Sequence, residues 1–267
     1  MSLGSIHKKI KIALKGAINS KSRLWNMLAR LDDLLYRLLV RTPPKPPVSS
    51  REIISKYSSA QKDIFFIEIG ANDGIMDDPI YEFVKRDRWT GILIEPVKRI
   101  FEKLVSNYDL CDNLIFENCA IANENGNRDF HYIKQPGNSP SGYEGIGSLL
   151  KDKFHADPMV KEQYLTTENV QCITLDTLLE KHNVKKVNVL VIDTEGYDYE
   201  IIKTINFSRI RPNIILFEAT HLTIDDYKSC TKLLKNSGYA LYAEGKDILG
   251  LYGVDITNLL HGNGNDL

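Results

Sequence analysis

Acidic side chains recur at the ends of short apolar runs in this 267-residue sequence. The run FFIEIGANDG carries Glu68, GILIEP carries Glu95, VLVIDTEG carries Asp193 and Glu195, and PNIILFE ends at Glu218. Runs of this length and composition are typical of parallel strands that are buried on both faces. The carboxyl ends of parallel strands share one edge of a sheet. We therefore expect these carboxylates to gather at one ligand site.

The glycine loop after Glu68 indicates which ligand these acids would hold. Gly70 and Gly74 bracket Ala71, Asn72 and Asp73, so the middle glycine of the dinucleotide motif GxGxxG is missing. No lysine follows to bind a nucleoside triphosphate, and carboxylates would repel phosphates. S-Adenosylmethionine fits better, because it carries a sulfonium and an ammonium group and no phosphate. Glycines would also let the backbone pass close to it.

Each acid of this set has an expected role and a structural alternative. Glu95 would accept hydrogen bonds from both ribose hydroxyls, or it would only cap the helix that follows. Asn72 and Asp73 would bind the amino-acid end of the cofactor, directly or through water. Asp73 could instead be a turn former. Glu68 would orient the loop, or it would be purely structural.

The order of these segments resembles the FkbM-type methyltransferase family. The blocks FIEIGANDG, GILIEPV, NCAIANENGN, GIGSLL, ITLDTLL, VLVIDTEGYDYEIIKTI and PNIILFEATHL carry the resemblance, from about residue 65 to residue 222. It implies a class I, S-adenosylmethionine-dependent O-methyltransferase whose acceptor is a saccharide or another hydroxyl-bearing compound. It also implies that the cofactor site includes Gly70, Asn72, Gly74 and Glu95, with Asn118 and Ala120 near the adenine, and Ser148 and Asp193 near the cofactor or the acceptor. Val191 departs from the family, since many members carry a lysine there.

A sugar hydroxyl is a poor nucleophile, so a base must take its proton as the new bond forms. His221 is one candidate, because its neutral form can accept a proton near pH 7. Asp193 and Glu195 compete with it or would orient the acceptor, and Glu195 could instead favour the helix start that follows. Asp193, Glu218 and His221 could converge on a metal. We expect no metal, because acid-rich strand ends also occur without one.

The alternation of apolar runs with helical patterns predicts an α/β fold with an open sheet. The resemblance specifies a Rossmann-like, mostly parallel seven-stranded sheet with helices on both faces. We expect NLIFENCAI to be its third strand, RDFHYI an extra edge strand, and two late runs a closing hairpin. The Gly-, Pro- and Ser-rich segment 135–154 is typical of a lid, in which Tyr143 would stack on a sugar ring or anchor the loop.

The first 50 residues differ in composition from the rest. Residues 1–42 are predicted to form a basic amphipathic helix, because leucines recur with four-three spacing at positions 24, 28, 31, 35 and 38. Residues 43–50 form a Pro-rich linker, and residues 51–267 form the methyltransferase domain. The helix would pack on its own domain, form a homodimer, or rest on an anionic membrane surface.

The overall composition excludes some classes of function. A net charge of −1 gives no reason to expect nucleic-acid binding. The four cysteines show no metal-like spacing and favour reduced thiols in a cytoplasmic protein, with association to a membrane as an alternative. Two other functions stay open from the sequence: a catalytically inactive binding or scaffold protein of the same fold, and a nicotinamide-dependent sugar oxidoreductase.

Overall fold

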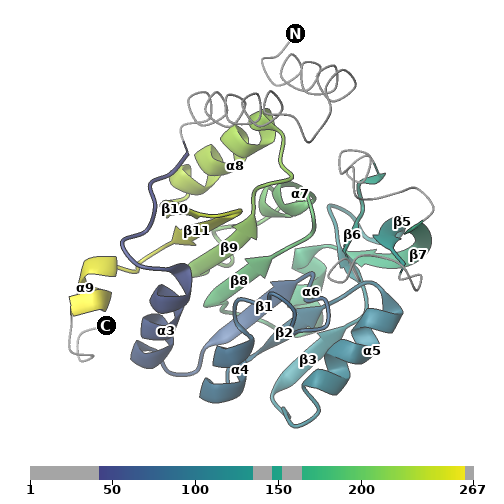
Figure 1. Ribbon diagram of the computed structural model, residues 1–267, viewed down its shortest axis with the longest axis horizontal. Coiled ribbons are helices and arrows are strands. Elements are labelled where there is room, and N and C mark those ends of the chain that lie inside the picture. Colours follow the sequence, from purple (N-terminus) through teal and green to yellow (C-terminus); the bar gives the residue numbers. More distant parts are fainter. Residues whose placement is uncertain (1–41, 135–145, 152–163, 262–267) are drawn as a thin grey trace, which may run out of the picture.

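The computed structural model describes residues 42–134, 146–151 and 164–261. They form a seven-stranded sheet covered by helices and a four-stranded sheet beside it (Figure 1). The expected N-terminal helix, Tyr143 and most of the expected lid lie outside the described residues, and these expectations stay predictions. No helix within the described ranges is long and apolar enough to span a bilayer.

The large sheet has the strand order β10-β11-β9-β8-β1-β2-β3. Its strands are β1 (Phe65–Ile69), β2 (Thr90–Ile94), β3 (Leu114–Glu117), β8 (Val189–Ile192), β9 (Ile214–Glu218), β10 (Ala240–Glu244) and β11 (Asp247–Leu251). Neighbours from β9 to β3 are parallel, and β11 is antiparallel to both β9 and β10. This confirms the mostly parallel sheet and the closing hairpin. The chain order reverses between β1 and β8, and ligands of open α/β sheets bind at such a point.

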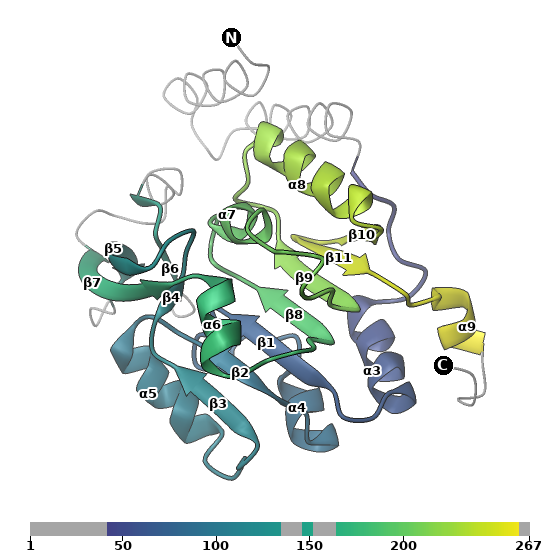
Figure 2. The same cartoon turned by 180° about the vertical axis from the view of Figure 1, so that it is seen from behind.

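Helices cover both faces of the sheet (Figures 1 and 2). They are α3 (Ser50–Ala60), α4 (Tyr81–Asp87), α5 (Lys98–Asn107), α6 (Leu175–Lys181), α7 (Asp198–Ile202), α8 (Ile224–Asn236) and α9 (Ile256–His261). In β1, Phe66 belongs to the hydrophobic cluster of α3, α4 and α9, whereas Ile67 belongs to the cluster of α6, α7 and α8. Both faces are apolar because successive strand residues point to opposite sides.

The smaller sheet has the order β4-β7-β5-β6. Its strands are β4 (Ala120–Ile121), β5 (Gly126–Ile133), β6 (Gly147–Ser148) and β7 (Leu165–Ile173). Two expectations were wrong here. The segment NLIFENCAI is not one strand, because it leaves the large sheet after Glu117 and enters the small one at Ala120. The segment RDFHYI is not an edge of the large sheet, because β5 pairs with β7 and β6.

Short polar side chains fix where several helices begin. The Oγ1 of Thr174 accepts a hydrogen bond from the N–H of Thr177 at 3.1 Å, and Thr223 does the same for Asp226 at 3.1 Å. Thr174 therefore caps α6, and Thr223 caps α8.

The Pro-rich linker contacts the edge strand β10 of the large sheet. The carbonyl of Pro44 accepts a hydrogen bond from the N–H of Ala243 in β10 at 2.9 Å. The N–H of Ser50 donates to a carboxylate oxygen of Glu244 at 2.6 Å. The linker therefore satisfies part of an edge strand that would otherwise present unpaired backbone groups.

Candidate active site

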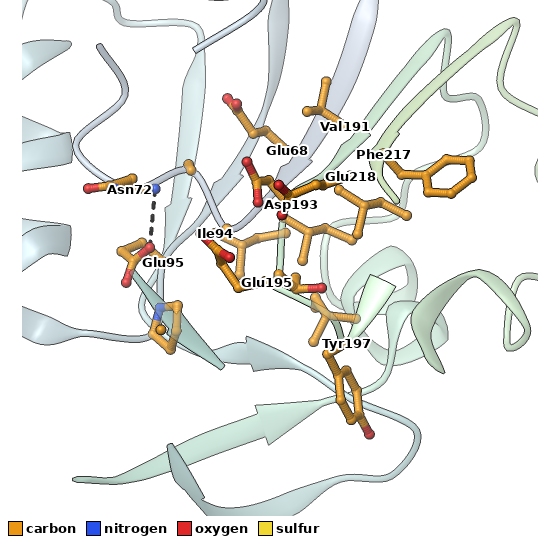
Figure 3. A pocket seen from close by; sticks show the side chains of 18 of the residues that line it. Glu68, Asn72, Ile94, Glu95, Val191, Asp193, Glu195, Tyr197, Phe217 and Glu218 are labelled. Carbon is orange, nitrogen blue, oxygen red and sulfur yellow. Dashed lines mark hydrogen bonds between the residues drawn. The ribbon is translucent and has the colours of Figure 1, made fainter. Parts of the chain in front are cut away.

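A cavity lies at the carboxyl ends of β1, β2, β8 and β9, where the chain order reverses. Figure 3 shows the carboxylates of Glu68, Glu95, Asp193, Glu195 and Glu218, which come from these neighbouring strand ends. The smaller sheet closes one side of the cavity through residues of β5 and β6. The strand-end acids therefore meet at one site, as the sequence predicts.

The loop after β1 packs so closely that one position excludes any side chain. A Cβ on Gly70 would lie 1.9 Å from the carbonyl oxygen of Asp193, and the φ of Gly70 is +84°. The N–H groups of Gly70 and Ala71 both donate to the carbonyl of Ile94 at 3.0 Å. The backbone at Gly70, just after β1, therefore forms this part of the cavity wall, where it contacts the ends of β2 and β8.

Glu95, at the end of β2, is buried with 3% of its surface exposed and lines the cavity. One of its carboxylate oxygens accepts a hydrogen bond from the N–H of Asn72 at 3.1 Å, and the other from Val97 at 2.8 Å (Figure 3 draws the first). Burial raises the pKa of Glu95 to about 8, although these two bonds lower it. Each oxygen keeps a lone pair, so the pair of oxygens can accept from two neighbouring hydroxyls.

Three more carboxyl groups crowd the space beside the glycine loop. Glu68 is 4% exposed, and burial together with the charges of Asp78 and Asp193 raises its pKa well above the ordinary value. Burial raises the pKa of Asp78 to about 6. Glu68 Oε2 and Asp193 Oδ1 are buried atoms without a hydrogen-bond partner among the described residues. Buried polar atoms are normally paired, so this cluster is suited to a cationic group that donates hydrogen bonds.

The loop after β8 is built to present Glu195 to the cavity. Glu195 has a φ of +55°, which is rare for a residue with a side chain. Asp198 is fully buried and accepts hydrogen bonds from the N–H groups of Thr194 at 3.4 Å and Gly196 at 3.0 Å. Burial and the charge of Asp193 raise the pKa of Asp198 to about 7. Asp198 therefore holds the turn from which the side chain of Glu195 projects.

A second group of charges lies where β9 ends. His221 Nε2 is 3.2 Å from Glu195 Oε2 and 3.6 Å from Glu218 Oε2. Ligand atoms of these three residues lie within 4.8 Å of one another, a set that could hold a divalent cation. This set contains Glu195 in place of Asp193, which the sequence had suggested. The expectation that no metal is used stays a prediction.

Seven of the residues expected in the site line the cavity: Glu68, Gly70, Asn72, Glu95, Ala120, Asp193 and Glu195. His221 does not line it, although it contacts two carboxylates that do. The structure therefore places His221 beside Glu195 and Glu218, outside the cavity lining.

Four further expected residues lie outside the lining, and each has another contact. Asp73 Oδ1 accepts hydrogen bonds from the N–H groups of Ile75 and Met76, so Asp73 forms a turn. A Cβ on Gly74 would lie 2.5 Å from the ring of Tyr108, so this glycine allows close packing on α5. The remaining two hold backbone: Asn118 donates to the carbonyl of Glu95 at 2.8 Å, and Ser148 donates to that of Thr194 at 3.3 Å.

Several cavity residues were missed from the sequence. Asp78 lies in the cavity, but in the segment MDDPI it resembles an ordinary turn former before proline. Lys246 also lines the cavity, and its segment EGKD resembles a polar hairpin turn. Tyr197 lines it and receives a hydrogen bond from Arg128 at 2.8 Å. Lys246 could be placed in the cavity only from the structure, in which the β10–β11 hairpin folds back onto the strand ends.

Comparison with known proteins decides the class of the molecule. The model of the Methyltransferase FkbM domain matches residues 68–241, which is most of the chain. The chain belongs to the FkbM methyltransferase family. It is therefore an enzyme, a methyltransferase dependent on S-adenosylmethionine, with the Rossmann-like fold described above.

Individual relatives of this FkbM methyltransferase are distant. "Methyltransferase 1" of Beauveria bassiana (strain ARSEF 2860) is 24% identical over 193 residues, which are 69% of this chain and 76% of that protein. The methyltransferase FkbM structure from Methylobacillus flagellatus KT has 10% identity and a TM-score of 0.47; the match covers 84% of this chain and 60% of that one. A putative caffeoyl-CoA O-methyltransferase structure from Staphylococcus aureus has 11% identity and a TM-score of 0.42, with 92% and 100% covered.

Proposed function

We propose that the cavity binds S-adenosylmethionine and that the enzyme transfers the methyl group to a hydroxyl, with a saccharide or glycoconjugate as acceptor. The observation that carries the proposal is the set of acids around the glycine loop: Glu68 and Glu95 are buried, and Glu68 Oε2 and Asp193 Oδ1 are buried atoms without a hydrogen-bond partner among the described residues. This set favours a ligand with positive charge and hydroxyl donors over any phosphate ligand.

The residues present fit the parts of this cofactor. Glu95 would accept hydrogen bonds from the two ribose hydroxyls, since its carboxylate faces the cavity and keeps free lone pairs. Glu68, Asp78 and Asp193 would hold the ammonium of the methionyl end. The apolar part of the lining at Ala120 and its neighbours suits the adenine ring.

When bound, the cofactor supplies an electrophilic methyl group on a positively charged sulfur. The chain must bring the acceptor oxygen in line with the bond from sulfur to methyl and exclude water. It must also take the hydroxyl proton as the new bond to oxygen forms. Glu195 and Asp193 line the cavity and are the two candidate carboxylates for this step, whereas His221 contacts Glu195 without lining the cavity. We assign the base to Glu195, because the strained turn directs it into the cavity.

The saccharide acceptor comes from the family resemblance, and the acidic lining supports an uncharged form of it. Eight carboxyl side chains line the cavity among the described residues, and those that are ionised would repel a phosphorylated acceptor. The acceptor class can be tested by following the transfer of a labelled methyl group to a panel of uncharged and phosphorylated saccharides. Methylation of the phosphorylated members alone would contradict the assignment.

Calorimetric titration with S-adenosylhomocysteine, the demethylated product, tests cofactor binding directly. We expect binding to the folded enzyme, and absence of heat at several temperatures with a folded protein would contradict the proposal. Several temperatures are needed because a binding enthalpy can pass through zero.

Glu195→Gln tests the base. The substitution keeps the size of the side chain and removes its ability to take a proton. We expect kcat for an acceptor found in the panel to fall about a hundredfold or more, with the affinity for S-adenosylhomocysteine unchanged. Asp193→Asn is the matched comparison. If Asp193→Asn abolished transfer and Glu195→Gln did not, Asp193 would be the base.

A further inference from the structure

Lys246 is the one basic side chain among the described residues that line the cavity. It lies in the turn between β10 and β11, and its carbonyl accepts a hydrogen bond from the N–H of Ala219 at 2.8 Å. Its Nζ is 3.5 Å from Glu218 Oε1 and 3.9 Å from Asp193 Oδ2. The backbone of Lys246 is therefore fixed at the end of β9, while its half-exposed side chain reaches toward two strand ends.

The ammonium of Lys246 keeps its charge at neutral pH. Burial alone would lower its pKa, but the neighbouring carboxylates of Asp193 and Glu218 raise it above the ordinary value. It faces a lining of eight acids: Glu68, Asp77, Asp78, Glu95, Asp193, Glu195, Glu218 and Asp247. Lys246 is thus a tethered cation in an acidic cavity, beside the carboxylates of Asp193 and Glu218.

Asp193 connects Lys246 to the part of the cavity assigned to the cofactor. The carbonyl oxygen of Asp193 is the atom that leaves no room for a Cβ on Gly70. The charge of Asp193 also contributes to the raised pKa of Glu68, so these two carboxyl groups interact. A cation that contacts Asp193 therefore lies close enough to act on a second cation bound beside the glycine loop.

We propose that Lys246 sets the preference of the site between the donor, whose sulfur is positively charged, and the product, whose sulfur is neutral, an inference that rests on the proposed function. In methyl transfer the acceptor oxygen bonds to the methyl carbon, and the sulfur keeps the electron pair of the broken bond and becomes neutral. Carboxylates alone would stabilise the sulfonium most strongly before the reaction. A fixed cation offsets that ground-state stabilisation, which would otherwise raise the barrier.

The affinity ratio between S-adenosylmethionine and S-adenosylhomocysteine tests this role without an acceptor. Both compounds carry the same ammonium and carboxylate, so their ratio isolates the sulfonium charge. We expect Lys246→Met to shift the ratio toward S-adenosylmethionine by about five- to thirtyfold in low salt. Lys246→Arg keeps the charge and should keep the ratio. Lys232→Met removes an exposed lysine of α8, outside the cavity, and should also keep it.

An unchanged ratio in Lys246→Met, or a shift toward the product, would overturn the proposal. Lys246→Gln repeats the test with a polar side chain, and thermal denaturation shows whether each variant folds. If neither variant folds, Lys246 is a structural residue and the proposal fails. If the unmodified enzyme binds neither compound, the proposed cofactor site itself is wrong, which is a different result.

Discussion

Glu95 shows how a single residue can be prepared for a ligand. It is buried and held by two backbone N–H groups, and burial raises its pKa to about 8. A pair of ribose hydroxyls would replace the water lost by its charged form, so a bound cofactor should favour the ionised carboxylate.

Replacing Glu95 by Gln should weaken binding of S-adenosylhomocysteine. The amide can accept through only one oxygen, so at least one hydrogen bond to a charged group is lost, about 1.5–3 kcal/mol. Calorimetric titration measures the effect, and Glu124→Gln, an exposed position, is the matched control. Equal affinity of the two variants for S-adenosylhomocysteine would show that Glu95 does not bind the cofactor.

The sequence predicted the strand-end acids of the site well, but it did not predict which small polar residues line the cavity. Acids at strand ends must project toward the shared edge. By contrast, Gly147 lines the cavity and Ser148 does not, because the hydroxyl of Ser148 donates to the carbonyl of Thr194 and accepts from the N–H of Leu150. No sequence signal fixed the register of this two-residue strand, so Ser148 could not be excluded beforehand.

At the scale of elements, the site depends on two loops that pack against each other. The loop after β1 touches the end of β8 at Gly70, and the loop after β8 is held by Asp198. Shifting either loop would move the cofactor wall and Glu195 together.

Gly70→Ala should destabilise the fold and remove cofactor binding. The new methyl group would lie 1.9 Å from a backbone oxygen, and backbone cannot move aside as a flexible side chain can. Gly245→Ala is the control, since nothing lies within 4 Å of its Cβ and its φ is also positive. Thermal denaturation compares the two. A loss no greater for Gly70→Ala than for Gly245→Ala would show that the loops are not tightly packed.

Asp198→Ala should loosen the turn that carries Glu195. It leaves two partly buried N–H groups, those of Thr194 and Gly196, without this partner, so we expect the free energy of unfolding to fall by about 1–3 kcal/mol. Asp198→Asn keeps an acceptor and should lose less. Urea denaturation measures this difference, and an alanine variant as stable as the parent would contradict the role of Asp198.

The large sheet was predictable because its strands are near-continuous apolar runs, a pattern that only burial on both faces explains. The small sheet was not. Two of its four strands, β4 and β6, have two residues each, too few for a periodic pattern, and β5 and β7 are held mainly by pairing with each other.

For the whole molecule, acids in and beside the cavity lower the stability of the fold to an extent that depends on pH. The pKa values of Glu95, Asp198 and Asp78 are raised to about 8, 7 and 6. The folded protein therefore holds protons that the unfolded chain releases above about pH 4 to 5. The stabilising contribution of these protonated groups to the free energy of unfolding is fully present below that range and is lost as pH rises toward 8.

We expect Glu95→Gln to be more stabilising, relative to the parent, at pH 8 than at pH 5, because glutamine does not ionise. Urea denaturation at the two pH values gives the comparison. If the difference in free energy of unfolding between variant and parent were the same at both pH values, the pKa of Glu95 would not be raised by folding.

A crystal structure of the enzyme with S-adenosylhomocysteine tests the central claim most directly. We predict the ribose hydroxyls on the carboxylate of Glu95, the ammonium beside Glu68, Asp78 and Asp193, and the sulfur open toward Glu195. A ligand bound elsewhere, or a ribose turned away from Glu95, would contradict this account of the site.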